Sequence, residues 1–154
     1  MTCVCSTPVA LSPATAGLKT LARVEQVLAR AEWDDPDIAE GLMLDPFGHI
    51  VSGTMTNFFC ARNGRLLTPH LAEAGIEGIM RSVVLEQAKQ AGIDVVETRI
   101  GLAELVTGDE LFVTNSQIGL WPIRRIGEQP YAPGELTRLL MQRLATVGVK
   151  ECAV

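Results

Sequence analysis

The amino-acid sequence predicts one domain of the α/β class. The chain has 154 residues, the length of one ordinary domain, and 47% of them are hydrophobic, enough to bury a substantial core. Short apolar runs typical of strands alternate with three longer segments in which apolar residues recur at helical spacing. One hairpin signal is especially strong, because Asn63-Gly64 lies between two apolar runs. These observations together favour a sheet with helices packed on it.

The first part of the chain is predicted to form a short strand and then a helix. Thr2–Ser6 has the composition of a strand that ends before Pro8. Residues 20–32 have an amphipathic helical pattern, and Pro36 excludes its continuation. We expect the apolar stripe of this helix to pack on the core, and its members are Leu21, Val24, Val27, Leu28 and Ala31.

An antiparallel meander is predicted for residues 41–68. Strand-like runs are separated by a turn at Gly48 and by the Asn63-Gly64 turn. In the rest of the chain, predicted helices alternate with predicted strands. Its expected helices cover 77–91, with Gly92 as C-terminal cap, and 134–146; a short helical turn covers 102–105; and the expected strands cover 95–100, 109–114 and 118–126.

Charge and cysteine content exclude several classes of protein. The net charge is −5 and the sequence has no basic stripe with interleaved aromatic residues, which argues against a nucleic-acid partner. No apolar run is long enough to span a membrane, and the first residues lack the features of a secretory signal. The four cysteines and two histidines show no metal-binding spacing, so we expect no metal. This pattern is typical of a cytoplasmic enzyme or domain.

Lys19 is the lysine whose position suggests chemistry. Of the three lysines, Lys89 lies on a helical pattern near Glu86 and Lys150 lies in the C-terminal tail, whereas Lys19 immediately precedes the apolar stripe. An ammonium at the start of a core-packed helix would lose hydration, which favours the unprotonated amine that Schiff-base chemistry needs. The alternative is a structural lysine whose stem covers apolar surface while its head reaches water.

Two loops have features of phosphate-binding sites. Gly75 and Gly78 precede the helix expected at 77–91, where backbone N–H groups and the helix dipole favour an anion. Residues 114–117, Thr-Asn-Ser-Gln, follow a buried strand and supply hydroxyl and amide groups. The alternatives are an ordinary helix entry with Glu77 in the first turn and an ordinary turn.

Five blocks, in order along almost the whole chain, resemble the class IV aminotransferase family of pyridoxal phosphate enzymes. The first block joins Gly17-Leu-Lys19 to Glu25-Gln-Val-Leu-Ala-Arg-Ala-Glu-Trp33 and, together with the last block, is most similar to the 4-amino-4-deoxychorismate lyase branch. The other four blocks are Glu40-Gly-Leu-Met-Leu-Asp45, Ser52-Gly-Thr-Met-Thr-Asn-Phe-Phe59, Gly75-Ile-Glu-Gly-Ile-Met-Arg81 and Asn115-Ser-Gln-Ile-Gly-Leu-Trp-Pro122.

The resemblance implies a fold and an activity. Residues 1–154 would form one domain, corresponding to the larger C-terminal domain of the D-amino-acid and branched-chain aminotransferase-like fold. That domain is a mostly antiparallel, barrel-like sheet flanked by helices. The family's smaller N-terminal domain, which carries a phosphate-binding arginine, would be absent. The implied reaction converts 4-amino-4-deoxychorismate to 4-aminobenzoate and pyruvate in folate biosynthesis, by a cytoplasmic homodimer with a small-molecule substrate.

The resemblance also implies roles for six residues. Lys19 would be the catalytic residue that holds pyridoxal 5′-phosphate as a Schiff base and then acts as general base and acid. The cofactor phosphate would lie on Gly78, Ile79, Ser116 and Gln117. Ser52 stands where the family has the glutamate that pairs with the pyridine nitrogen.

A second departure from the family concerns Ala22, which stands where the family has an asparagine. Together with the expected absence of the N-terminal domain, this change and Ser52 keep two alternatives open. One is another class IV aminotransferase, for branched-chain or D-amino acids. The other is a catalytically inactive domain.

Overall fold

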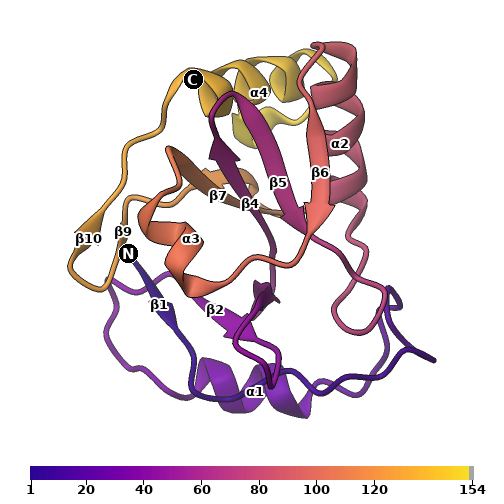
Figure 1. Ribbon diagram of the computed structural model, residues 1–154, viewed down its shortest axis with the longest axis vertical. Coiled ribbons are helices and arrows are strands. Elements are labelled where there is room, and N and C mark those ends of the chain that lie inside the picture. The colour runs from indigo at the N-terminus through magenta and orange to yellow at the C-terminus, as the bar shows by residue number, and fades with distance from the viewer. Residues whose placement is uncertain (153–154) are drawn as a thin grey trace.

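Two five-stranded sheets form the framework of the protein. The computed structural model describes residues 1–152, and Figure 1 shows the strands of the two sheets together with the helices. Their strand orders are β10-β9-β1-β2-β3 and β6-β5-β4-β7-β8. Of the eight strand pairs, five are antiparallel and three are parallel. The predicted α/β class with mainly antiparallel pairing is therefore confirmed.

The first sheet combines the N-terminal strand with a later hairpin and two very short strands. Its strands are β1 (Thr2–Val4), β2 (Glu40–Leu44), β3 (Ile50–Gly53), β9 (Arg125–Ile126) and β10 (Gln129–Pro130). β1 runs parallel to both β2 and β9, whereas β2 and β3 form an antiparallel pair.

The second sheet contains the hairpin predicted at Asn63-Gly64. Its strands are β4 (Asn57–Arg62), β5 (Arg65–Pro69), β6 (Val95–Thr98), β7 (Glu110–Asn115) and β8 (Gly119–Pro122). Asn63 and Gly64 have φ of 51° and 74°, the positive values that a tight two-residue hairpin turn requires, so this prediction is confirmed. The single strand predicted at 118–126 is wrong, because β8 and β9 belong to different sheets.

The continuous meander predicted for residues 41–68 is interrupted at residues 54–56. β3 and β4 do not pair with one another, and the chain passes from the first sheet to the second between them. The crossing is a tight turn in which the N–H of Gly53 donates to the carbonyl of Thr56 at 2.8 Å. Side-chain hydrogen bonds to a residue of β2, described below, hold this turn. Local periodicity carries no signal for such a change of sheet.

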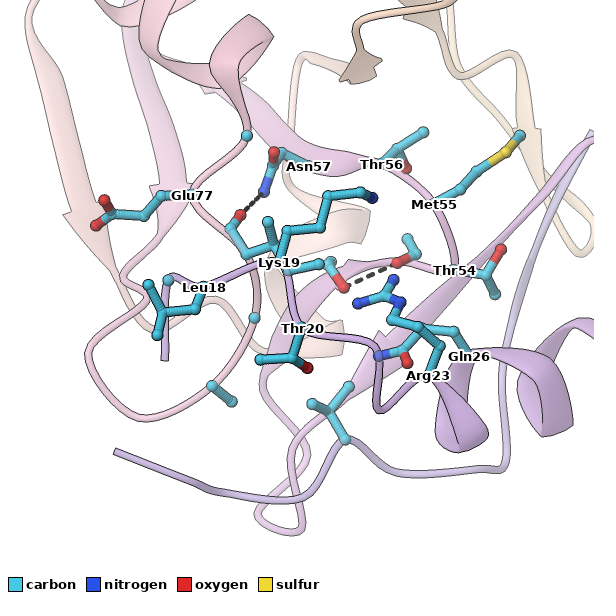
Figure 2. A pocket seen from close by; sticks show the side chains of 18 of the residues that line it. Leu18, Lys19, Thr20, Arg23, Gln26, Thr54, Met55, Thr56, Asn57 and Glu77 are labelled. Atoms are coloured by element: carbon cyan, nitrogen blue, oxygen red, sulfur yellow. Dashed lines mark hydrogen bonds between the residues drawn. The ribbon is translucent and has the colours of Figure 1, made fainter. Parts of the chain in front are cut away.

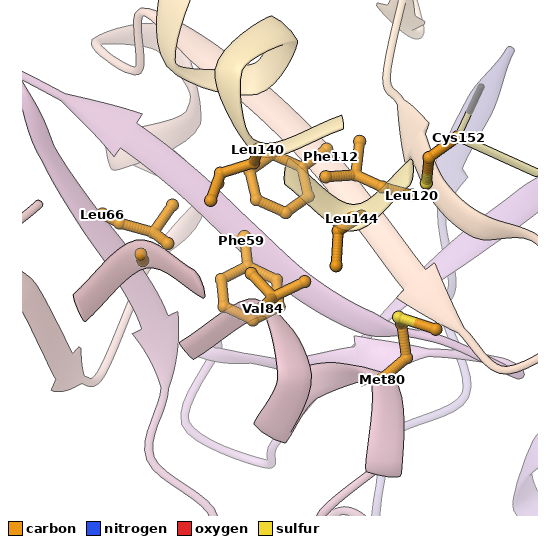
Figure 3. Close-up of a cluster of buried hydrophobic side chains, with 10 residues drawn as sticks. Phe59, Leu66, Met80, Val84, Phe112, Leu120, Leu140, Leu144 and Cys152 are labelled. Atoms are coloured by element: carbon orange, nitrogen blue, oxygen red, sulfur yellow. The ribbon is translucent and has the colours of Figure 1, made fainter. Parts of the chain in front are cut away.

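Two helices cover one face of the second sheet. These two helices are α2 (Ile79–Gln90) and α4 (Glu135–Thr146). The other helices are α1 (Val24–Arg30), α3 (Leu102–Val106) and the 3₁₀ helix η1 (Lys150–Cys152). Side chains of α2 and α4 pack on the sheet around Phe59 and Phe112, whose rings stack with centroids 5.0 Å apart (Figure 3). Glu110 joins α4 to β7, because its carboxylate accepts the N–H groups of Leu136 and Thr137 at the start of α4.

The prediction for the first helix is wrong in length and in burial. The helix predicted at 20–32 covers only Val24–Arg30, and Ala29 is its one buried residue. Leu21 is fully exposed and Val27 is 66% exposed, so the stripe does not pack on the core. The segment before the helix is instead tied to a distant loop, since Gly17 exchanges backbone hydrogen bonds with Gly75 and Glu77 at 3.0 Å each. The pattern showed that one face is apolar but not what would cover it.

Candidate active site

A cavity of about 760 Å³ lies where the two sheets and the approach to α1 meet. Four segments line it: parts of residues 9–26, the turn 52–57, the entry to α2 at 74–79, and the loop 115–117. All six residues singled out in the sequence line this cavity, namely Lys19, Ser52, Gly78, Ile79, Ser116 and Gln117. They come from four separate stretches of the chain, so the fold brings together what the sequence keeps apart.

Lys19 projects into the cavity from the segment that precedes α1. The pairing of Gly17 with Ile76 fixes this segment against the entry to α2. Figure 2 shows the Lys19 ammonium extending toward Thr56 and Asn57, while Leu18 points away. The predicted partial burial of the amine is wrong, because the side chain is exposed. Loss of hydration at Lys19 therefore has to come from whatever fills the cavity.

Ser52 lies on β3, deep in the cavity wall. It is 9% exposed, and its hydroxyl donates to the carbonyl of Gly53 at 2.8 Å. With its proton used in this way, the hydroxyl oxygen can accept a hydrogen bond from a ligand but brings no negative charge.

The buried carboxylate of Glu40 stabilises the turn after Ser52 through hydrogen bonds. This carboxylate accepts hydrogen bonds from the N–H and the hydroxyl of Thr54, at 3.0 and 2.5 Å, and from the hydroxyl of Thr56 at 2.8 Å. The N–H groups of Gly41 and Met55 donate to it as well, at 2.9 and 3.3 Å. Such a well-satisfied buried carboxylate makes the cavity wall rigid.

The start of α2 has the features of an anion site. Gly78 is the N-cap and contributes no side-chain hydrogen bond, and the first turn contains no acidic residue. The first N–H groups of a helix have no partner within it, so they are available to a ligand at this end. Glu77 precedes the helix, and Figure 2 shows its carboxylate directed away from Lys19. An ordinary entry with Glu77 in the first turn is therefore not what the structure shows.

The second predicted loop lies on the same cavity and is fixed by Asn115. The Asn115 side chain accepts the N–H groups of Gln117 and Ile118 at 2.8 and 2.9 Å, which shapes the loop. Its amide group also donates to the carbonyl of Met55 at 3.2 Å. On the other side, Asn57 donates to the carbonyl of Ile76 at 2.8 Å, shown as a dashed line in Figure 2. These contacts join both loops to the turn that follows Ser52.

Sequence reasoning missed several residues that build the site. It gave no role to Glu40, Thr54, Thr56 or Asn57, although all of them fall in the quoted blocks. It also missed Arg23, which lines the cavity together with Lys19 and which nothing in the sequence separates from the other arginines.

The buried thiols do not add a nucleophile to this site. Burial raises the pKa of Cys5 to about 12 and that of Cys60 to about 11, so both stay protonated at neutral pH. Within residues 1–152, no group of three or more histidine, cysteine, aspartate or glutamate side chains is arranged to hold a metal ion. In the same range, no helix is both long and apolar enough to cross a membrane.

Comparison with known proteins gives consistent matches. The family described as amino-transferase class IV matches residues 2–126. An aminodeoxychorismate lyase of Vibrio harveyi is 35% identical over 147 residues, which cover 93% of this chain and 54% of that protein.

Solved structures match over the same extent. The 4-amino-4-deoxychorismate lyase of Pseudomonas aeruginosa is 44% identical with a TM-score of 0.91, covering 94% of this chain and 53% of that one. A branched-chain amino acid aminotransferase of Thermobaculum terrenum, in its PLP form, is 27% identical with a TM-score of 0.88, covering 97% and 51%. The chain thus spans about half the length of the proteins it matches.

Proposed function

Because the chain belongs to the class IV aminotransferase family, whose cofactor is pyridoxal 5′-phosphate, we propose that it forms the lysine-bearing half of a 4-amino-4-deoxychorismate lyase. The reaction releases 4-aminobenzoate and pyruvate and serves folate biosynthesis. One observation carries the proposal: the amine of Lys19 shares a cavity with an uncapped helix start and the Asn115–Gln117 loop. The similarity to both lyases and branched-chain aminotransferases leaves a related amino transfer as the second candidate.

The residues of the cavity fit the cofactor. Lys19 is the one lysine that lines the cavity, and it would bind the cofactor and later move a proton at the substrate. Gly78 and Ile79 would hold the phosphate through backbone N–H groups, and Ser116 and Gln117 would do so from the opposite loop. When bound, pyridoxal phosphate supplies the electron sink for bond cleavage at the substrate.

Ser52 favours the lyase over amino transfer. Its hydroxyl can accept a hydrogen bond only from a protonated ring nitrogen, and it cannot supply the negative charge that would stabilise that protonated form. Amino transfer depends on a strong electron sink, whereas the lyase reaction gains driving force from forming an aromatic product. We expect 4-aminobenzoate release to exceed keto-acid-dependent amino transfer by this chain. Faster amino transfer would refute the lyase assignment.

Selective labelling of Lys19 tests the cofactor site without relying on activity. The chain is incubated with pyridoxal phosphate and reduced with borohydride, and the modified peptides are mapped. We expect the label on Lys19, with Lys89→Ala labelled like the wild type and Lys19→Ala losing the label. An even distribution over Lys19, Lys89 and Lys150 would support the inactive-domain alternative.

We further propose that the active form is a homodimer in the cytoplasm. The exposed stripe on and before α1 is the surface that supports assembly, because Leu21, Val24 and Val27 are exposed apolar side chains and Val24 also lines the cavity. The four cysteines are free, which favours a reducing compartment.

A further inference from the structure

Arg23 is a cation in the cavity with no ionic partner in the described structure. It lines the same cavity as Lys19 and is half-buried. Within residues 1–152, the ion pairs are His49–Asp45, Arg65–Asp94, Arg81–Glu97 and Arg99–Glu73, so none involves Arg23. Within residues 1–152, the guanidinium group of Arg23 also donates no hydrogen bond to the protein. A half-buried guanidinium group without a partner points to a ligand that supplies one.

The position of Arg23 is not explained by the stability of α1. It is the N-cap residue, where its side chain makes no capping hydrogen bond. Helix N-caps favour short side chains that accept hydrogen bonds, and the N-terminal end of a helix favours negative charge. An arginine here satisfies neither preference. The placement is unfavourable locally, which is a common property of residues that serve a binding site.

The surroundings of Arg23 suit a carboxylate. Arg23 lines the cavity, and Figure 2 shows its guanidinium group near Thr54, below the side chain of Lys19. Two carboxylates line the cavity, but Glu77 is turned away in Figure 2, and Glu25 forms no ion pair with Arg23. Arg23 and Lys19 thus offer two basic side chains that line one cavity.

We propose that Arg23 binds the substrate carboxylate that is retained in 4-aminobenzoate. This inference rests on the proposed function, whose product is a rigid ring with an amine at one end and a carboxylate at the other. The amine end belongs at Lys19, so the carboxylate end needs a cation elsewhere in the cavity, and Arg23 provides it. A guanidinium group binds a carboxylate through two parallel hydrogen bonds, which selects aromatic acids over neutral analogues.

The test compares a charged and a neutral probe on two variants. Binding of 4-aminobenzoate and of uncharged 4-aminobenzamide is measured by calorimetry or NMR titration. The chains are the wild type, Arg23→Gln and the control Arg138→Gln, which removes the same charge from an exposed position on α4, at the far end of the molecule from α1 in Figure 1.

We expect Arg23→Gln to weaken 4-aminobenzoate binding about tenfold, the loss of a charge-assisted pair, and to leave 4-aminobenzamide binding unchanged. Arg138→Gln should bind both probes like the wild type. The melting temperature of Arg23→Gln should be equal to or above that of the wild type, because the arginine does not cap α1. Equal 4-aminobenzoate affinity in Arg23→Gln and wild type overturns the proposal, as does a wild type that binds neither probe or an equal loss for both probes.

The Lys19 labelling experiment separates this inference from the cofactor proposal. Label spread over all lysines, combined with a selective 4-aminobenzoate defect in Arg23→Gln, would refute the cofactor site and support Arg23 as an aromatic-acid site. Label concentrated on Lys19, combined with unchanged 4-aminobenzoate binding in Arg23→Gln, would refute the role of Arg23 alone.

Discussion

Glu40 and Thr54 are joined by two hydrogen bonds across the junction of the two sheets. The Glu40 carboxylate, at the start of β2, accepts both the backbone N–H and the hydroxyl of Thr54. The connection holds the turn between Ser52 and Asn57 in the shape that forms one wall of the cavity. A buried, hydrogen-bonded side chain thus supports the site without lining the cavity itself.

Replacing Glu40 should destabilise the protein and disorganise the site. We expect Glu40→Ala to lower the free energy of unfolding by about 2–4 kcal/mol, because several buried donors lose their acceptor. Urea denaturation measures this change, and pyridoxal phosphate labelling of Lys19 should fall in parallel. The control Glu86→Gln alters an exposed carboxylate on α2 and should leave both quantities unchanged. A Glu40→Ala chain as stable as the wild type would show that the turn is held by other contacts.

Restoring a carboxylate at position 52 should strengthen cofactor binding. Ser52→Glu places a negative charge where the family pairs one with the ring nitrogen, and a charge-assisted hydrogen bond is stronger than a neutral one. The dissociation constant for pyridoxal phosphate, followed by absorbance, should fall about tenfold, which corresponds to one such bond. Ser52→Gln has the same length without the charge and should not gain affinity. Equal effects of both variants would argue that position 52 does not face the ring nitrogen.

Asp45 should make stability depend on acidic pH. Burial alone would raise the pKa of Asp45, but the N–H groups of His49 and Phe47 and the His49 ring outweigh it and lower this pKa below its usual 3.8. A lowered pKa means that the ionised group stabilises the fold above pH 3.8, and that this stability is lost as the pH falls through the folded-state pKa.

The matching variant is Asp45→Ala. At pH 7 it should lower the free energy of unfolding by about 1–3 kcal/mol, through loss of the turn hydrogen bonds. The difference from the wild type should shrink as the pH falls below 3.8 and through the lowered folded-state pKa, where the carboxyl of the folded wild type takes up its proton. Thermal denaturation at a series of pH values measures it, and a difference that is constant with pH would contradict the ionic contribution.

The exposed stripe of α1 should control assembly. Val27→Glu puts a charge on the proposed interface and should convert a dimer to a monomer in sedimentation experiments, because burying an unpaired charge is costly. Val106→Glu is the matched control, since Val106 on α3 is 68% exposed and Val27 is 66% exposed. The control should assemble like the wild type. If the wild type is already monomeric, or if both variants assemble equally, this surface is not the dimer interface.

Much of the secondary structure could be predicted from the sequence. Residues near in sequence determine turns and helix ends, which is why the Asn63-Gly64 hairpin and the helices α2 and α4 lie within a few residues of their predicted positions. The ordered blocks, from the Lys19 block to the Asn115 block, also predicted the family and the α/β class. Turn signals, helix ends and sequence blocks all depend on residues that lie close together in the sequence.

The tertiary structure decided what depends on contacts between distant residues. It placed Lys19, Ser52, Gly78 and Ser116 around one cavity, and it changed sheets at the turn held by Glu40. It also left the α1 stripe exposed, because an amphipathic pattern specifies an apolar face and not its partner. Arg23 became distinguishable from other arginines only when its surroundings were known, since the absence of a carboxylate partner is a property of three-dimensional packing.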